Sequence, residues 1–438
     1  MSQYTELTAR AADGLDPEFG ENKDGKVILR FPGARDTSGE CIAEYEGNIY
    51  VGGGVDANVD GFDIFHQLGV ACLHKDGTLN RAFGKDGFVV VRFGPTQDTH
   101  LRQILFPTVG GEPRILLSGI DTKKGDVVLA RLHLDGRLDR AFCVDGQLTV
   151  KLPEILAKDL GLDFTPQATT SMDASGPCTV ADGKIYVVMR MYMPIWIAQV
   201  ALLIRLNSDG SFDTTFNNTG YVAVTNQHWG NSTIEDILVH NGKITVCGTL
   251  AGHGMVARVN EDGSFDQAFA DKGFKLFENP SLALRKLVQY SEGAVLAAGS
   301  ASSPSQGVLA CVNDQGELVP TFNDGKVLFQ SLEKHVGFWD VGLFAGKIIA
   351  SGRLAQENGS PSFLVVRYHL NGMLDEGFGH EGKGWNATQF ENQYTVAHRM
   401  TLQADGNVLI VGDWANGLSP AALLARFLNP AASPAPTA

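Results

Sequence analysis

The sequence predicts an all-β fold: a seven-bladed β-propeller with four-stranded blades, in which the N-terminal strand completes the C-terminal blade and closes the ring. Three observations predict it. One motif, typified by Ile204–Phe216 and the strand at 220–224, recurs about every 60 residues. Two further short strands separate successive copies, so each repeat holds the strand content of one blade. The motif is also split between the two chain ends, which indicates that the ends meet.

Each copy of the motif consists of a strand, a tight turn and a second strand, with a Phe between the turn and the second strand. The turn is Asp-Gly in most copies, a strong hairpin signal because Gly tolerates positive φ and Asp bonds its own backbone. The turn glycines are Gly77, Gly136, Gly210, Gly263, Gly316 and Gly372. The phenylalanines are Phe19, Phe83, Phe142, Phe216, Phe269, Phe322 and Phe378.

Two more strands are predicted between copies of the motif. In one repeat they are 235–240 and 243–248, joined at Asn241-Gly242. The second of these strands ends in Gly in every repeat except at 184–189; the glycines are Gly53, Gly119, Gly248, Gly299, Gly352 and Gly412. The apolar runs are nearly continuous, which suits sheets that are covered on both faces by neighbouring blades.

The chain ends predict ring closure. Residues 424–429 form the first half of the motif without its turn, whereas 15–19 and the strand at 26–31 form the second half. Pairing them avoids two exposed sheet edges. Either half, counted along the chain, gives seven copies. We therefore expect an N-terminal tail at 1–11, a propeller at 12–430 and a disordered tail at 431–438.

A charged pair recurs within the motif. An Arg stands five residues before the turn Gly (Arg131, Arg205, Arg258, Arg367), and an Asp stands three residues before the Phe (Asp139, Asp213, Asp266, Asp375). The two repeats that lose the Arg, at Cys72 and Cys311, also lose the Asp, at Asn80 and Val319. This joint loss predicts contact across the hairpin with a structural role. Asp16 and Arg426 are then expected to meet where the ring closes.

The pattern Asn-x-Asp-Gly-Ser-Phe-Asp-x-x-Phe-x-x-x-Gly at 207–220 and 260–273 resembles the delta-60 repeat family of bacterial β-propellers. The resemblance extends from about Asp13 to Asn429 and implies a binding or scaffold propeller. It assigns no catalytic or ligand residue. The copy at 313–325 departs most, because Gln315 replaces the Asp and one residue is missing before Gly325, so we expect an irregular blade there.

Composition excludes some functions. The formal net charge of −14 argues against nucleic-acid binding. The longest apolar stretch, Met191–Ile204, contains Pro194 and is too short for a transmembrane segment. The first residues lack the basic start and apolar core of a signal peptide, which predicts a cytoplasmic protein by default and leaves non-classical secretion open. The six cysteines lie without close pairs and are expected to be buried and reduced.

The sequence contains no nucleophile elbow, no His-Glu-x-x-His motif and no His/Cys cluster, so we assign no catalytic or metal residue and leave enzymatic activity open. The loops at Asn207, Asp209 and Asp213 offer oxygen atoms at a spacing that suggests calcium. They lack the distal Glu of a helical calcium loop, and a turn that hydrogen-bonds itself is favoured. Calcium is therefore the one cofactor that stays a candidate.

The loops predict where ligands bind. The Asp-Gly turns and the turns of the Asn241-Gly242 type share one rim, whereas longer connections, including an insertion at 153–177 with a short helix expected at 154–160, lie on the other rim. Binding residues concentrate on such irregular loops. The first strand of each blade is expected to line the channel with Glu40, Arg102, Glu235, Asp236, Arg285, Asp340, His398 and Arg399. These charges suit either a polar ligand or a hydrated channel with self-compensating ion pairs.

The favoured function is a non-enzymatic binding or scaffold propeller that recognises a protein or carbohydrate ligand on its loop-rich rim. Planar side chains there suit sugar faces or peptide side chains. The candidate ligand-binding residues are Tyr192, Trp196, His228, Trp229, Trp339, His398, Arg399 and Trp414. The alternatives are a hydrolase or lyase with a polar site at the channel mouth and a metal-stabilised structural module.

Overall fold

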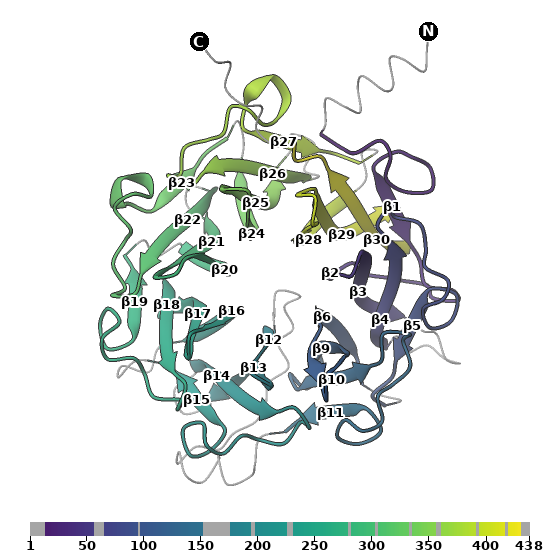
Figure 1. Ribbon diagram of the computed structural model, residues 1–438, viewed down its shortest axis with the longest axis horizontal. Helices are drawn as coiled ribbons and strands as arrows, with labels where there is room; N and C mark the ends of the chain where they lie inside the picture. The colour runs from purple at the N-terminus through teal and green to yellow at the C-terminus, as the bar shows by residue number, and fades with distance from the viewer. Residues whose placement is uncertain are drawn as a thin grey trace.

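The computed structural model is a ring of seven four-stranded antiparallel sheets around a central channel (Figure 1), which confirms the predicted seven-bladed propeller. It describes residues 14–56, 65–94, 97–151, 176–193, 198–225, 231–278, 282–302, 305–332, 335–355, 361–390, 394–416 and 419–430. The expected helix at 154–160 and most of the insertion around it lie outside these residues.

The blades follow one another along the chain, and each sheet runs from the channel outward. Blade one contains β2 (Cys41–Tyr45), β3 (Asn48–Asp56), β4 (His66–His74) and β5 (Phe88–Val91). Blade two contains β6 (Thr99–Leu105), β9 (Ile115–Asp121), β10 (Val127–Leu132) and β11 (Gln147–Val150). Blade three contains β12 (Cys178–Ala181), β13 (Lys184–Met193), β14 (Ala198–Asn207) and β15 (Tyr221–Val224). Blade four contains β16 (Ser232–His240), β17 (Lys243–Leu250), β18 (His253–Asn260) and β19 (Phe274–Phe277).

Blade five contains β20 (Leu282–Ser291), β21 (Ala294–Ser302), β22 (Ser305–Asn313) and β23 (Leu328–Gln330). Blade six contains β24 (Val336–Phe344), β25 (Lys347–Leu354), β26 (Ser362–His369) and β27 (Trp385–Thr388). Blade seven contains β28 (Tyr394–Leu402), β29 (Val408–Asn416), β30 (Ser419–Phe427) and β1 (Lys26–Leu29). A small hairpin, β7 (Thr108–Val109) with β8 (Glu112–Pro113), extends the second blade.

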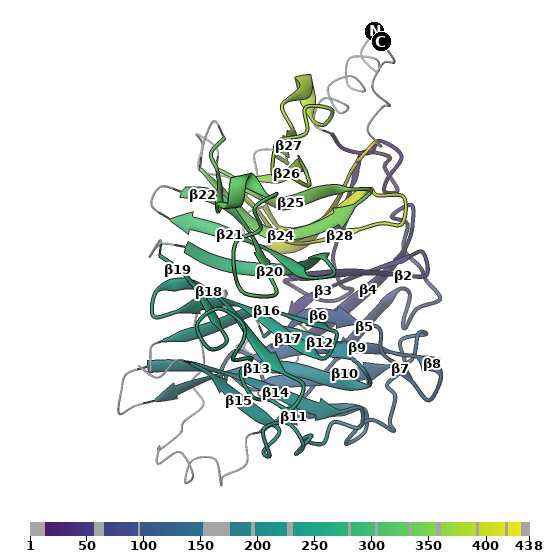
Figure 2. The same ribbon diagram turned by 60° about the vertical axis from the view of Figure 1, so that its left-hand side comes forward.

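The middle strands form the core. β9 and β10 are buried along their whole length because neighbouring blades cover both faces of each sheet, as the side view in Figure 2 shows. The motif Phe of every repeat is buried between blades, with Phe19, Phe142 and Phe216 fully inaccessible to solvent. The nearly continuous apolar runs of the sequence therefore correspond to two-sided burial.

Ring closure follows the prediction. β1 pairs antiparallel with β30, with Lys26 opposite Ala425. Asp16 donates its backbone N–H to the carbonyl of Arg426 at 2.8 Å, and the Arg426 guanidinium binds the Asp16 carboxylate at 2.7 Å. Two segments from opposite ends of the chain thus complete one blade, and the outer edge of β30 is covered.

The recurring Arg and Asp form a buried ion pair in each repeat that carries them, with N–O distances of 2.8 Å for Arg131–Asp139, 2.8 Å for Arg205–Asp213, 2.9 Å for Arg258–Asp266 and 2.7 Å for Arg367–Asp375. Each guanidinium also lies over the motif Phe of its own repeat, as Arg205 does over Phe216 at 4.7 Å. It then donates to the turn of the next blade; Arg131 reaches the Ser208 carbonyl at 2.7 Å. The predicted pair therefore joins consecutive blades.

A third charged residue, a Lys, belongs to this cluster in three of the blades. Lys184, Lys243 and Lys347 each lie 2.9 Å from the motif Asp of their own repeat. The two repeats without the pair replace all three positions by uncharged residues: Asn48, Cys72 and Asn80 in blade one, and Ala294, Cys311 and Val319 in blade five. Neutralising all three positions together avoids a buried charge without a partner.

The blade expected to be irregular departs locally. Its turn after Phe322 is a short 3-10 helix, η1 (Asn323–Gly325), and β23 has three residues where the outer strands of the other blades have four. A similar turn, η2 (His380–Gly382), occurs in blade six. None of the helices in the described residues has the length and hydropathy needed to span a membrane.

Candidate functional site

The channel mouth on the loop-rich rim is shaped by a repeated β-bulge. In β6, β16, β20, β24 and β28 the register with the second strand shifts by one residue in the first half of the strand. A carbonyl just before the bulge lies against the repeated Gly of the second strand. The sequence predicts that the strand ends at this Gly, but the strand continues past it, as β25 does past Gly352 to Leu354. A Cβ on Gly352 would stand 1.9 Å from the Gly337 carbonyl oxygen, and one on Gly248 would stand 2.0 Å from that of Thr233. The repeated Gly is therefore a steric requirement of the bulge.

In each of these five blades the bulge sets one residue of the first strand apart from the pairing. The residues at this position are Arg102, Glu235, Arg285, Trp339 and His398. In blade one Gly53 approaches the carbonyl of Ser38, two residues before Glu40, so Glu40 holds the equivalent place. The innermost strands encircle the channel in Figure 1. The charged residues predicted for the channel lie on these strands or directly before them, and we call them the mouth ring.

Much of this charge is paired across the seams between blades. Arg102 binds Glu40, and Arg190 binds Glu235 at 2.8 Å. Lys286 binds Asp236 at 3.0 Å. These pairs match the expectation of self-compensating charges, and each of them joins two neighbouring blades.

Two buried carboxyls of the ring, Glu40 and Asp340, have pKa values that are shifted in opposite directions. Burial alone would raise the pKa of Glu40, but the charges of Arg102 and His100 hold it well below its usual range. For Asp340 burial outweighs the charges of Lys286 and Arg399, and its pKa is raised. The Asp340 carboxylate accepts the backbone N–H of Val341 at 2.8 Å and that of Met400 at 3.1 Å.

A cluster of arginines surrounds Trp339. The guanidinium carbon of Arg285 lies 3.9 Å from the centroid of the Trp339 ring, and that of Arg353 lies 5.4 Å from it. Arg399 lies in β28 of the next blade, where its guanidinium donates to the His398 carbonyl at 3.4 Å. Arg353 is exposed, and the charge of Arg399 acts on the buried Asp340 carboxyl. Two guanidinium groups thus lie beside one aromatic ring.

His398 belongs to a second kind of contact. Its Nε2 lies 3.0 Å from the Asp413 carboxylate, whose other oxygen accepts the backbone N–H of Gly39 at 2.8 Å. A carboxylate fixed in this way orients an imidazole. The arrangement is capable of proton transfer if a substrate reaches the ring.

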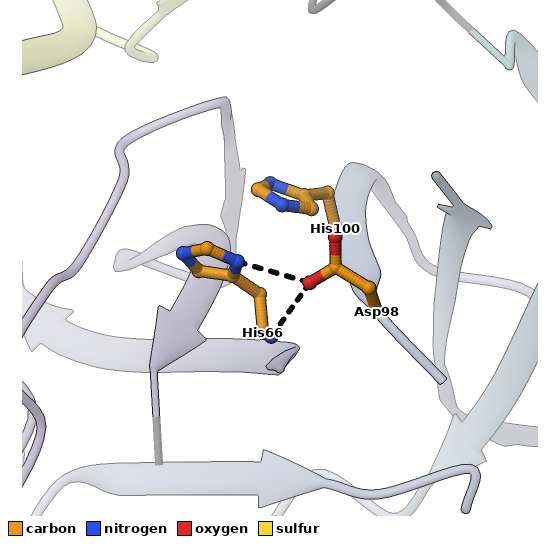
Figure 3. A group of neighbouring side chains, drawn as sticks. All are labelled: His66, Asp98 and His100. Atoms are coloured by element: carbon orange, nitrogen blue, oxygen red, sulfur yellow. Dashed lines mark hydrogen bonds and ion pairs between the residues drawn. The ribbon is translucent and has the colours of Figure 1, made fainter. Parts of the chain in front are cut away.

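Two more histidines lie on the same rim, at the seam between blades one and two (Figure 3). His66 begins β4, Asp98 precedes β6, and His100 lies within β6. The Nδ1 of His66 is 3.0 Å from Asp98, and the two imidazole centroids are 4.5 Å apart. The Nδ1 of His100 is 2.6 Å from Glu40, which connects this group to the mouth ring. Burial alone would lower the pKa of His66, but the hydrogen bond and charge of Asp98 raise it.

The structure sorts the predicted ligand residues into three groups. Trp339 and His398 take the bulge position of the adjacent strands β24 and β28, and Arg399 follows His398 in β28. Trp414 is buried in a hydrophobic core cluster, so it is a core residue and we leave it out of the site. Tyr192 lies in β13 without a described side chain, and Trp196, His228 and Trp229 lie outside the described residues.

Sequence reasoning missed His66, Asp98, Arg353 and Asp413. Aligning the inner strands on the repeated Gly would have identified the position at the mouth, and Arg353 and Asp413 each follow that Gly directly. His66 and Asp98 had no such signal, because they come from different blades. The calcium interpretation of the turns has little support from geometry: Asp209 accepts hydrogen bonds from Ser211, whereas Asp213 binds Arg205.

Solved structures that resemble the chain share its fold at low sequence identity. A peptidase from Mycobacterium tuberculosis that hydrolyses puromycin is 9% identical with a TM-score of 0.45, over 92% of this chain, which spans about half (51%) of the peptidase. The β-propeller domain of the Trilobed protease from Pyrococcus furiosus is 8% identical with a TM-score of 0.43, over 86% of this chain and 90% of that one. The polysaccharide lyase Uly1 is 9% identical with a TM-score of 0.43, over 91% of both chains. Matches this distant carry no argument about activity.

No curated protein matches the chain in sequence. Segments 197–216, 241–269 and 346–378 match a family model described as "Domain of unknown function (DUF5122) beta-propeller". All three segments fall on the motif and the strands around it, which is consistent with the propeller repeat seen in the structure.

Proposed function

We propose that the protein is a non-enzymatic binding propeller whose ligand docks on the loop-rich rim at the channel mouth, and that this ligand is a carbohydrate bearing a negatively charged group such as a carboxylate. We also propose that its repeats are of the delta-60 kind. The observation that carries the functional proposal is the arginine cluster of Arg285 and Arg353 around Trp339.

The chemistry of this cluster favours an anion. Guanidinium groups bind carboxylates through paired, charge-assisted hydrogen bonds. The ring of Trp339 holds the Arg285 guanidinium at 3.9 Å, so it fixes the direction of a cation as well as offering apolar surface. The whole chain has a formal net charge of −14, and a local positive cluster on such a surface would guide an anion to one place.

The test is a binding screen with acidic and neutral oligosaccharides of matched length, followed by titration calorimetry. We expect binding of an acidic saccharide that weakens about tenfold in Arg353→Gln and weakens with added salt. Arg353 is exposed and suits the test because its replacement should leave the fold intact. Arg81→Gln, an exposed Arg in the hairpin turn of blade one on the opposite rim, is the matched control and should bind normally.

Equal binding of neutral and acidic saccharides, or full binding by Arg353→Gln, would contradict the proposal. Binding of acidic peptides alone would replace the carbohydrate by a protein partner. Turnover of a bound saccharide would favour the second candidate, a hydrolase or lyase, for which the oriented His398–Asp413 pair is the specific support. In that case His398→Gln should abolish turnover and retain binding.

A further inference from the structure

His66, Asp98 and His100 present two imidazoles and one carboxylate to one small volume. One potential ligand atom from each lies within 4.8 Å of the other two. Figure 3 shows the two rings and the carboxylate facing one another from neighbouring blades. Among the described residues this is the one group of His, Cys, Asp or Glu side chains that meets this spacing.

We propose that His66, Asp98 and His100 form a binding site for a divalent transition-metal ion such as Zn²⁺ or Co²⁺. Two nitrogen ligands and one oxygen ligand suit these borderline ions, whereas Ca²⁺ and Mg²⁺ prefer all-oxygen sites. The proposal does not depend on the carbohydrate site, which lies on blades five and six.

The neighbouring groups hold these side chains in place without a metal. The carboxylate of Glu40 accepts the Nδ1–H of His100 at 2.6 Å, which leaves Nε2 of His100 for a cation. The backbone N–H of His66 donates to Asp98 at 2.7 Å, and the Thr122 hydroxyl donates to its other oxygen at 2.5 Å. Carboxylates that bind the second nitrogen of a ligating His are the usual outer contacts of metal sites.

Metal binding needs a small contraction and the loss of one proton. Ligand atoms around a tetrahedral Zn²⁺ are about 3.3 Å apart, given bonds of about 2.0 Å. The 3.0 Å contact between His66 Nδ1 and the Asp98 oxygen is close to that spacing, so the ion would replace the proton that now joins them, and this proton would pass to water. His100 then has to approach the pair.

The site would keep one open position. Three protein ligands leave a fourth tetrahedral position for water or an external ligand. The three side chains are partly accessible, with 26% of His66, 17% of Asp98 and 16% of His100 exposed. An ion here would therefore face the loop-rich rim and be reachable from solvent.

Titration of the full-length protein tests the proposal. The protein would be stripped with chelator and placed in a Cys143→Asn background, because Cys143 is the exposed cysteine among the six. We expect one equivalent of Co²⁺ to bind, with visible absorption bands of a four-coordinate ion, and Zn²⁺ to displace it. Ca²⁺ and Mg²⁺ should bind at least tenfold more weakly.

Variants distinguish this site from other histidines. His66→Gln and Asp98→Asn should each weaken Co²⁺ binding by tenfold or more, while metal-free melting temperatures confirm that both are folded. His240→Gln, which changes an exposed His on the opposite rim, should bind normally. Absence of saturable Co²⁺ binding, or undiminished binding in folded His66→Gln, would overturn the proposal.

Discussion

At the scale of single residues, the repeat is maintained by a buried charge cluster. In blade three, the Asp213 carboxylate binds both Arg205 at 2.8 Å and Lys184 at 2.9 Å. Burial alone would raise the pKa of Asp213. Hydrogen bonds from Thr215 and Lys184 and the charge of Arg205 outweigh burial, so this pKa is lowered. Blade five shows that the same geometry can be built without charge, from Ala294, Cys311 and Val319. The cluster is thus one unit whose members depend on one another.

This dependence predicts non-additive mutations. Asp213→Val should lower the free energy of unfolding by about 3–5 kcal/mol, because it leaves the buried Arg205 without its carboxylate. The triple change Lys184→Ala, Arg205→Cys, Asp213→Val copies blade five and should cost less than Asp213→Val alone. Urea unfolding measures both. Asp209→Ala, in the same hairpin, removes exposed hydrogen bonds and should cost about 1 kcal/mol. A triple variant with a lower free energy of unfolding than Asp213→Val would contradict this account.

The residue after each motif Phe adopts positive φ, including Cys143 at 46° and Ala270 at 44°. Other repeats place Gly or Asn there, which tolerate this conformation. Ala270→Gly should therefore raise the free energy of unfolding by about 1 kcal/mol, measured as a higher melting temperature. Ala268→Gly, two residues earlier at negative φ, should instead lower it by about 0.5–1 kcal/mol.

At the scale of elements, the bulged first strand and its Gly form one device. In five of the seven blades the bulge sets one residue of the innermost strand apart from the pairing, and the Gly leaves room for the displaced carbonyl. Gly352→Ala should destabilise the protein by 2 kcal/mol or more, since its Cβ would lie 1.9 Å from the Gly337 oxygen. Gly337→Ala in the facing strand meets its nearest atom, on Ser300, at 3.6 Å and is the matched control. Equal effects in thermal unfolding would refute the steric explanation.

The two halves of this device differ in how well the sequence predicts them. The Gly is visible because it repeats, and hairpins are visible because their turns are local. The bulge is invisible, since a register shift between two strands leaves no residue type that marks it. Arg285 and Trp339 were each predicted as candidates, but their contact was not, and neither was the contact of His66 with Asp98. Both contacts lie across seams between blades, where contact depends on how neighbouring sheets stack.

At the scale of the whole molecule, the repeated carboxylates link stability to pH. The pKa values of Asp139, Asp213, Asp266 and Asp375 are lowered in the folded state, because hydrogen bonds and charges from cations such as Arg131 and Lys184 outweigh burial. An unfolded Asp titrates near pH 4 (about 3.9). Their contribution is therefore complete above about pH 4 and is lost as the pH falls through the lower folded values.

We accordingly expect the melting temperature to fall steeply below about pH 4. Asp213→Asn should lower stability at pH 7 and flatten this acid dependence, because one carboxylate with a lowered pKa is gone. Calorimetry between pH 2.5 and 7 measures both effects. An acid dependence that is unchanged in Asp213→Asn would show that other carboxylates dominate.

Ring closure is the property of the whole molecule on which the channel mouth depends. β1 covers the outer edge of β30, Asp16 neutralises the buried Arg426, and Phe19 is fully inaccessible to solvent in a core cluster. Deleting residues 1–31 would expose the edge of β30 and leave Arg426 without its carboxylate. We expect this variant to lose cooperative unfolding and to associate, as measured by calorimetry and size-exclusion chromatography.

The matched control and a rescue make the test specific. Deleting only residues 1–11 should change neither measurement, since the paired segment begins at Leu15, which bridges to Phe427. A synthetic peptide of residues 12–31 added to the longer deletion should restore the melting transition, because it supplies the missing strand, Asp16 and Phe19 together. The same peptide with Asp16→Asn should restore it less well, since Arg426 would remain buried beside a neutral partner. A longer deletion that melts like the full chain would mean that the other blades hold the ring without closure by β1.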